Sequence, residues 1–356
     1  MKYFLKFIFI FFCFSLLTAQ IPSYYQNVNL NLTGDLLKNE LSTLISSTHQ
    51  TQVEYTSSVS VDTWDVIKVS DGFSLDTSKV LLVYGYDDND PAVENDRTRA
   101  KSLSCHTSSC FGLWNREHVF PKSLASPNLV TNYPSAGTDV HNLRACDYST
   151  NASRSNKKFD AGNGNSSSNN QGNWYPGDEW KGDVARIIMY MYLRYPNQCE
   201  PTNVGIGTQL FSPNGDMPDV FLNWNFSDPV SDFEESRNNA IAIVQGNRNP
   251  FIDNPYLATI IWSGPAAEDK WASSNSIEDY ESNGDFDLRI NPLNNEIIIE
   301  NINLNSFISL EIINMKGEVV EFTKNNFLKN LDLAAGVYLA KITMKKTSYL
   351  RKISVN

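Results

Sequence analysis

The histidines of this chain are few enough to be weighed individually: His49, His106, His118 and His141. General burial tendencies favour a surface position for His49, which lies in a polar stretch, and His106 lies between two cysteines, where no catalytic role is expected. His118 differs because it directly follows Arg116 and Glu117 within an otherwise apolar segment. A neutral imidazole, with an ordinary pKa near ~6.5, can take a proton from water, and a neighbouring carboxylate is a hard oxygen ligand for a divalent cation. The pair predicts metal-assisted hydrolysis, with an ion-paired strand edge as the structural alternative.

Two polar segments follow the His118 segment: Asp139-Val140-His141-Asn142-Leu143-Arg144 and Asn151-Ala152-Ser153-Arg154-Ser155-Asn156-Lys157-Lys158-Phe159. Together with residues 114–122, they resemble the endonuclease I family of bacterial secreted and periplasmic nucleases, which belong to the His-Me finger (ββα-metal) group. Two further stretches support the likeness: KGDVAR at 181–186 and QGNRNPFID at 245–253. The resemblance covers residues 30–262.

The resemblance implies a role for each candidate residue. His118 is expected to be the general base that activates water, and Glu117 and Asn142 the metal ligands, with Asn151 as the alternative amide ligand. A helix cap is the structural alternative for Asn142. Arg154 lies one helical turn after Asn151 on the same face, and we expect it to be a catalytic residue that binds phosphate or stabilises the transition state, with a structural salt bridge as the alternative.

The remaining motif residues carry weaker expectations. Arg116 and Arg144 are lesser candidates for phosphate contact, and His141 is expected to hold the finger through hydrogen bonds. Relatives often carry proline where this chain has Ala145, which leaves the start of the following helix less constrained. The expected cofactor is Mg²⁺, with Ca²⁺ or Mn²⁺ as alternatives.

Charge decides whether nucleic acid is a plausible partner. The chain carries a net charge of −11, whereas phosphate contacts need clustered lysine and arginine. Residues 112–158 nevertheless hold six basic side chains against three acidic ones. The segment that carries the motifs is therefore positive within an acidic protein, and DNA and RNA are the expected substrates.

Periodicity and composition indicate the fold class. Residues 35–45 show apolar side chains at helical spacing, residues 79–86 predict a buried strand, and a second helix is predicted from Gly182 onward. Residues 160–173 are almost entirely Asn, Gly and Ser, which predicts a surface loop. Strands mixed with separate helices indicate an α+β fold, here a His-Me finger domain in residues 20–265.

The N-terminus indicates export. Lysines precede an apolar run of about eleven residues, which is too short to span a membrane, so residues 1–19 are expected to form a signal peptide. No later segment is apolar enough to cross a membrane. Export favours disulfides among the four remaining cysteines: Cys105 and Cys110 can close a short loop, which would leave Cys146 to pair with Cys199. Zinc binding is the alternative, but the chain has no CxxC pair.

The last part of the chain has a different pattern. A polar linker is expected over 266–287, followed by short alternating strands that predict a small all-β sandwich over 288–356. This module resembles the type A C-terminal sorting domain of the type IX secretion system in four stretches: Asn291-Pro292, Asn314-Met315-Lys316-Gly317, Ala335-Gly336-Val337-Tyr338 and Lys352-Ile353-Ser354-Val355. The likeness implies passage through the periplasm and secretion by that machinery, with a carbohydrate- or surface-binding module as the alternative.

The sequence therefore predicts a secreted, metal-dependent endonuclease that cleaves DNA and RNA with little sequence specificity and leaves 5′-phosphate ends. One alternative is a non-catalytic nucleic-acid-binding or adhesive protein, against which the complete set of Glu117, His118 and Asn142 speaks. The other is a zinc hydrolase, but no HExxH pattern occurs. Oligomeric state is not encoded in any pattern that we recognise.

Overall fold

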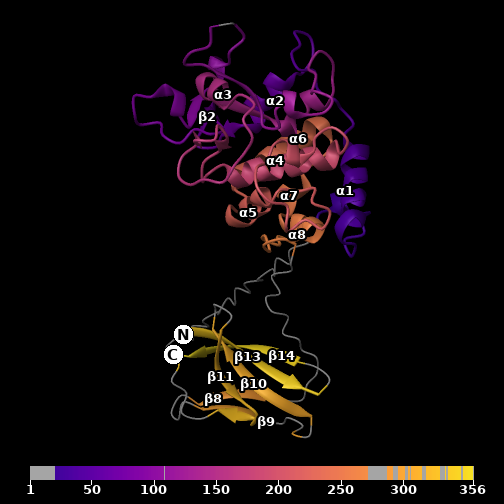
Figure 1. Cartoon of the computed structure of the whole chain (residues 1–356), viewed down its shortest axis with the longest axis vertical. Coiled ribbons are helices and arrows are strands. Elements are labelled where there is room, and N and C mark those ends of the chain that lie inside the picture. Colours follow the sequence, from indigo (N-terminus) through magenta and orange to yellow (C-terminus); the bar gives the residue numbers. More distant parts are fainter. Residues whose placement is uncertain are drawn as a thin grey trace, which may run out of the picture. The chain divides into compact units, whose positions relative to one another are not determined.

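The computed structural model describes residues 21–107, 109–271, 287–291, 296–300, 304, 306–314, 318–328, 333, 336–345 and 348–355. The contacts between residues separate a compact unit, Ile21–Trp271, from a second unit that holds the C-terminal strands (Figure 1). The predicted signal peptide and most of the predicted linker lie outside the described residues. The first unit extends past the predicted boundary at 265, because Trp271 packs against Tyr25 with ring centroids 4.7 Å apart.

A two-stranded hairpin followed by a helix forms the centre of the first unit. Strand β4 (Trp114–His118) pairs antiparallel with β5 (Leu143–Asp147), so that His118 lies opposite Leu143. Helix α3 (Tyr148–Arg154) begins directly after β5. Asp147 ends the strand and caps the helix, since its side chain accepts a hydrogen bond from the backbone N–H of Thr150 at 2.9 Å. This cap fixes the direction of α3 relative to the hairpin.

A helical layer buries most of the apolar side chains of this unit. Helix α4 (Lys181–Arg194) is buried along nearly its whole length and packs against α1 (Gly34–Thr48) and α5 (Asp219–Ser227). These helices confirm the two helical predictions. The remaining helices are α2 (Thr63–Ser70), α6 (Asp232–Gln245), α7 (Pro250–Asp253) and α8 (Tyr256–Trp262). Figure 1 shows α1, α4, α5, α7 and α8 in one half of the unit and α3 with β2 in the other.

Short strands and 3₁₀ helices complete the unit. A three-stranded sheet is formed by β1 (Gly72–Phe73), β2 (Asp76–Leu81) and β3 (Thr98–Ala100), and a small ribbon by β6 (Ser167–Ser168) and β7 (Trp174–Tyr175). The 3₁₀ helices are Ser23–Tyr25, Val93–Asn95, Lys101–Leu103, Lys122–Leu124, Ala136–Thr138, Val140–Asn142 and Pro201–Asn203. The strand predicted over 79–86 ends earlier than expected: Val83 donates to the carbonyl of Ala145 on β5, and Tyr84 then turns the chain with a φ of 73°.

A buried charge cluster ties the hairpin to the helices. The carboxylate of Asp71 accepts hydrogen bonds from Arg144 at 3.1 Å and from Arg237 at 2.9 Å, and Arg144 also pairs with Asp183 at 2.8 Å. All four side chains are buried. Arg144 is therefore placed within the scaffold, away from solvent and from any phosphate outside it.

The cysteines differ in part from the prediction. Cys105 and Cys110 form a disulfide, as expected, whereas Cys146 and Cys199 are free and buried. Cys146 lies on β5 with its thiol directed to the carbonyl of Val83, and Cys199 follows the end of α4. The expected Cys146–Cys199 pairing is therefore wrong, because each thiol is packed into its own surroundings in the core.

The second unit is built from two antiparallel sheets. One has the strand order β11 (Val319–Thr323), β10 (Phe307–Ile313), β13 (Gly336–Met344), β14 (Ser348–Val355), and the other β12 (Phe327–Leu328), β9 (Glu296–Glu300), β8 (Asp287–Asn291). Side chains of both sheets, among them Ile297, Ile299, Leu310 and Ile312, share one buried cluster. This arrangement agrees with the predicted sandwich. Across the described residues, no helix combines the length and the apolar character that crossing a membrane requires.

Candidate active site

A cavity of about 460 Å³ opens where β4, α3 and the segment after β4 meet. Its lining residues are Tyr55, Asn115, Arg116, Glu117, His118, Pro121, Lys122, Ser123, Asn151, Ser155 and Asn156. Glu117 and His118 are neighbours in sequence, yet both line this one cavity. The end of β4 thus meets the requirement that the backbone present both side chains to one site.

Glu117 is a buried carboxylate with two partners. Its Oε1 accepts a hydrogen bond from the hydroxyl of Tyr84 at 3.1 Å and lies 3.2 Å from the guanidinium of Arg154. Burial raises the pKa of Glu117 to about 7, against the opposing effects of Arg154 and the Tyr84 hydroxyl. Desolvation disfavours the charged form of this carboxylate, so a nearby positive charge, such as that of Arg154, stabilises its ionised state.

The ring of His118 is held in one tautomer. Its Nε2 lies 2.8 Å from the carbonyl oxygen of Gly137, and because a carbonyl can only accept, Nε2 must carry the proton. Nδ1 therefore keeps its lone pair. Burial lowers the pKa of His118 to about 3, so the ring is neutral at ordinary pH. Tyr55 stacks on it with ring centroids 5.7 Å apart.

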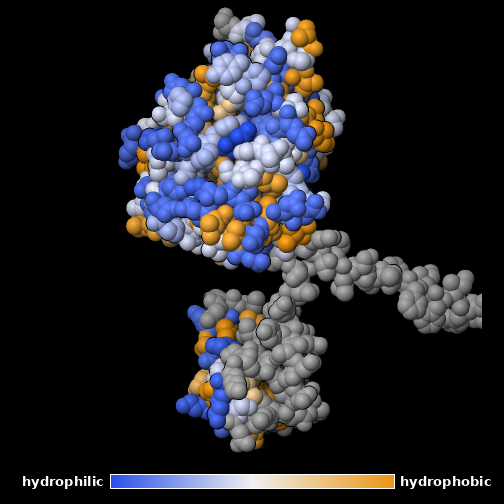
Figure 2. Space-filling model, turned by 90° about the vertical axis from the view of Figure 1, so that its right-hand side faces the viewer, coloured by the Kyte–Doolittle hydropathy of each residue, from blue (hydrophilic) through white to orange (hydrophobic). Residues whose placement is uncertain are grey.

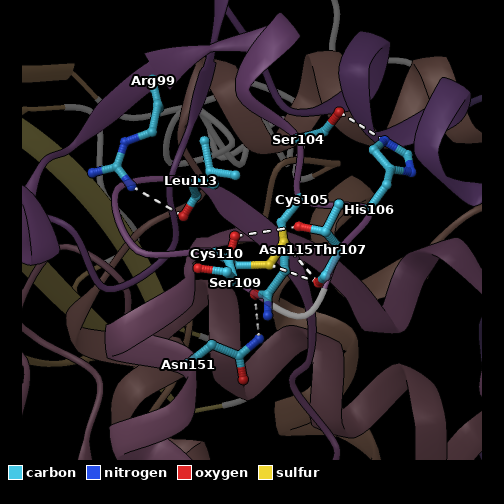
Figure 3. The surroundings of a disulfide bond; sticks show 10 residues. All are labelled: Arg99, Ser104, Cys105, His106, Thr107, Ser109, Cys110, Leu113, Asn115 and Asn151. Atoms are coloured by element: carbon cyan, nitrogen blue, oxygen red, sulfur yellow. Dashed lines mark hydrogen bonds between the residues drawn. A yellow bond between two sulfur atoms is a disulfide. The ribbon is translucent and has the colours of Figure 1, made fainter.

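The two asparagines considered as ligands lie in different places. Asn142 is fully buried, and its amide is paired with the backbone of Phe120: Oδ1 accepts from the N–H at 2.7 Å and Nδ2 donates to the carbonyl at 3.2 Å. Asn151 lines the cavity, and its Nδ2 donates to Oδ1 of Asn115 at 2.7 Å beside the disulfide loop (Figure 3). The structure thus brings Asn151, and not Asn142, into the cavity with Glu117 and His118.

Arg154 reaches the site from beneath. It is fully buried, and it donates to the carbonyls of His118 at 3.3 Å and Val119 at 2.8 Å as well as pairing with Glu117. It does not line the cavity. These contacts give Arg154 a role in positioning the end of β4, and its predicted contact with phosphate stays a prediction.

Arg116 supplies positive charge to the cavity wall. Its guanidinium lies between two aromatic rings, 3.4 Å from the centroid of Tyr55 and 4.1 Å from that of Trp64. It also donates to the Tyr55 carbonyl and to the Thr63 hydroxyl. Arg116 therefore holds Tyr55 in place against His118. Lys122 adds an exposed cation at the rim.

The other histidines are structural in their contacts. The imidazole of His49 is only 2% exposed and lies 3.8 Å from Asp139, so its predicted surface position is wrong. His141 is buried against Tyr190, in agreement with a structural role. His106 bonds to Ser104 within the disulfide loop and contacts Trp64, and it does not line the cavity (Figure 3).

Tyr84, Tyr55 and Gly137 contact Glu117 or His118 and were not predicted from the sequence. The strand pattern around Tyr84 carried no sign of a side-chain role, and Gly137 acts through its backbone, which no residue type reveals. Among the described residues, no group of three or more His, Cys, Asp or Glu side chains is placed to hold a metal ion. A closed zinc-type site is thus not found in that part of the chain.

Comparison with known proteins shows the family to which the chain belongs. The sequence pattern of the Endonuclease I family matches residues 33–256, which include the hairpin, α3 and α4. The chain belongs to the endonuclease I family. It is also 34% identical over 256 residues to an extracellular ribonuclease of Bacillus subtilis (strain 168), an alignment that covers 68% of this chain and 80% of that protein. An extracellular ribonuclease of Bacillus amyloliquefaciens is 34% identical over 257 residues, with 69% and 80% covered.

The C-terminal unit has its own match. Residues 291–356 match the secretion system C-terminal sorting domain. The chain is therefore a nuclease that carries a type IX sorting domain, and it is secreted or held at the cell surface. Hydrophilic residues cover most of the face of the nuclease unit seen in Figure 2, with smaller hydrophobic patches between them.

Proposed function

We propose that this chain is a metal-dependent endonuclease of the His-Me finger class that hydrolyses RNA and DNA with little sequence specificity and leaves 5′-phosphate ends. One observation carries the proposal: the His118 tautomer leaves Nδ1 unprotonated in a cavity that also holds a buried carboxylate. The antiparallel hairpin followed directly by α3 supports the ββα class. The relatives named extracellular ribonucleases support RNA as one substrate.

The chain's own groups account for the proton movement. Nδ1 of His118 accepts a proton from water as the water oxygen attacks phosphorus, and the bond from phosphorus to the 3′-oxygen breaks. The proton on Nε2 remains on the ring and is donated in a hydrogen bond to the carbonyl oxygen of Gly137. This bond keeps the ring oriented throughout the reaction. Breaking the bond to the 3′-oxygen leaves the phosphate on the 5′-oxygen of the downstream fragment, and the released 3′-oxygen takes a proton from solvent water. Because this attack does not use a 2′-hydroxyl, DNA is a substrate as well as RNA.

The residues present fit a hard divalent cation. Glu117 offers a buried carboxylate and Asn151 an amide oxygen, and both line the cavity. Mg²⁺ commonly binds through one or two carboxylates or amides while keeping several waters, and Ca²⁺ or Mn²⁺ accept the same donors. When bound, such a cation supplies positive charge for the developing phosphorane and the leaving oxygen. Arg154, which does not line the cavity, holds the Glu117 carboxylate through an ion pair at 3.2 Å.

Digestion of plasmid DNA and of RNA with the purified chain tests the proposal. EDTA should abolish cleavage of both, and adding Mg²⁺ should restore it. His118→Ala should reduce turnover by a factor of about 10²–10⁴, the usual contribution of a general base. His106→Ala, outside the cavity, should retain wild-type activity. Cleavage that persists unchanged in EDTA, or a fully active His118→Ala protein, would refute the proposal, and products with 3′-phosphate ends would refute the direction of attack.

A further inference from the structure

A second cavity lies beside the catalytic one. Its volume is about 340 Å³, and its lining residues are Tyr84, Tyr86, Glu94, Asn95, Ser149, Thr150, Ser153, Ser166, Ser167, Ser168 and Trp174. The rings of Tyr84 and Trp174 are buried and meet edge to face at 5.5 Å. Tyr86 is 39% exposed. The cavity therefore combines aromatic surface with hydroxyl and amide groups, a lining suited to a flat polar ring.

Tyr84 belongs to both sites. Tyr84 lines the second cavity, while its hydroxyl donates to Glu117 in the catalytic cavity. The backbone of Tyr84 adopts a φ of 73°, a left-handed conformation that an aromatic residue rarely takes and that concentrates at binding sites. The next residue has to be glycine, because a Cβ at position 85 would lie 2.1 Å from the carbonyl oxygen of Asp96. The fold thus maintains a strained turn that places one ring between the two cavities.

Helix α3 separates the two cavities and sets the distance between them. Ser149, Thr150 and Ser153 line the second cavity, whereas Asn151 and Ser155 line the catalytic one. An α-helix with its side chains is about 10 Å across, which corresponds to about three nucleotides of a stacked strand at ~3.4 Å each. A strand cut in the first cavity can therefore place a nearby base in the second.

The charges of the lining decide which part of a nucleotide fits. The catalytic cavity is lined by Arg116 and Lys122, whereas the second cavity is lined by no lysine or arginine and by one carboxylate, that of Glu94. A phosphate would be repelled there. The hydroxyl of Thr150 donates to the backbone carbonyl of Glu94, and none of the described side chains bonds to the Glu94 carboxylate. The two carboxylate oxygens are available to accept hydrogen bonds from a neutral ring.

We propose that this second cavity binds an unpaired guanine base of the substrate strand, a few nucleotides from the bond that is cut. Guanine presents two adjacent donors, N1–H and the 2-amino group, which match the two oxygens of a carboxylate. Adenine and cytosine each present one amino group beside an acceptor, and uracil presents one N–H between two acceptors. The base must be unpaired because pairing occupies the same edge. Stacking on the exposed ring of Tyr86 holds any base, which keeps cleavage largely non-specific, and Glu94 adds a modest preference for guanine.

The inference rests on the proposed nuclease activity, and mapping of cleavage positions tests it. The substrates are short single-stranded oligoribonucleotides with one guanine in an otherwise guanine-free sequence, and the same strands with inosine, which lacks the 2-amino group. The full chain should cut the guanine strand preferentially at a fixed offset within about three nucleotides of the guanine. Inosine, or Glu94→Gln, should reduce that preference about tenfold, in the range of a bidentate base contact.

A matched control uses another exposed glutamate. Glu268 lies on the surface and lines neither cavity, so Glu268→Gln should keep the wild-type cleavage pattern. Even cleavage along the guanine strand, or a guanine preference that survives Glu94→Gln, overturns the guanine site while leaving the nuclease activity standing. A chain that cuts no oligonucleotide under any metal condition overturns the proposed function, and the base site with it.

Discussion

Replacing Asn142 and Asn151 by alanine, one at a time, separates a buried scaffold residue from a ligand. Asn142 satisfies both the N–H and the carbonyl of Phe120 in a fully buried setting. Leaving a buried polar group unpaired costs about 1–3 kcal/mol, so Asn142→Ala should lower the free energy of unfolding by about 2–6 kcal/mol. Asn151 is half-buried, and the described partners of its side chain are Asn115 and the carbonyl of Arg116. Its loss should cost about 1 kcal/mol.

The effects on metal use should run in the opposite order. If Asn151 supplies the amide oxygen next to Glu117, Asn151→Ala should raise the Mg²⁺ concentration needed for half-maximal cleavage by at least tenfold, with a nearly unchanged urea midpoint. Asn142→Ala should shift the urea midpoint strongly, and the folded fraction that remains should need the same Mg²⁺ concentration as the wild type.

Urea unfolding followed by tryptophan fluorescence, together with Mg²⁺ titrations of RNA cleavage, measures both quantities on the same preparations. A normal Mg²⁺ requirement in Asn151→Ala combined with a raised one in a stable Asn142→Ala protein would refute this reasoning. That result would restore the ligand assignment implied by the sequence resemblance.

Three further predictions concern stability. Replacing both Cys105 and Cys110 by serine should lower the free energy of unfolding by about 2 kcal/mol, because the closure of a short loop is lost, as measured by urea unfolding against the oxidised wild type. Asp71→Asn should cost about 3–5 kcal/mol because two buried arginines lose their carboxylate, whereas Asp76→Asn, at a half-buried carboxylate that bonds to Ser78, should cost much less; equal losses in urea would contradict the role of the cluster. Burial lowers the pKa of His49 in the folded chain, so the unfolded chain binds a proton there more readily. The neutral ring of His49 therefore contributes to stability above about pH 6.5, and this contribution is lost as the pH falls. His49→Gln should therefore show a smaller fall in unfolding free energy than the wild type between about pH 7 and pH 5, and parallel curves would show that the ring does not titrate with unfolding.

The periodic elements could be predicted from the sequence because local pattern determines them. The apolar spacing of residues 35–45 and the run after Gly182 correspond to α1 and α4, and the strand-like segments of the last part of the chain correspond to β9, β10, β11, β13 and β14. Glu117 and His118 were found for a related reason. Ionisable side chains in an apolar frame are conspicuous in the sequence itself.

The remaining features depend on contacts between distant segments. His49 stands among polar neighbours, but the chain after α1 runs closely past Gly246, where a Cβ would lie 2.4 Å from the carbonyl oxygen of Thr48, and this approach buries the ring. The motif spacing likewise marked Asn142 without showing that Phe120 occupies its amide. An even number of cysteines suggested two disulfides, whereas packing in the core keeps two thiols apart.

The local character of the single disulfide in the described residues bears on how the enzyme matures. Cys105 and Cys110 are separated by only five positions, so they meet readily in a nascent chain before any tertiary structure exists. The two other thiols become enclosed by the core, out of reach of oxidants, once the helices pack. Oxidation of the exported chain should therefore need little help from a disulfide isomerase. If the bond between Cys105 and Cys110 forms first and the core then encloses Cys146 and Cys199, wrong pairings are avoided.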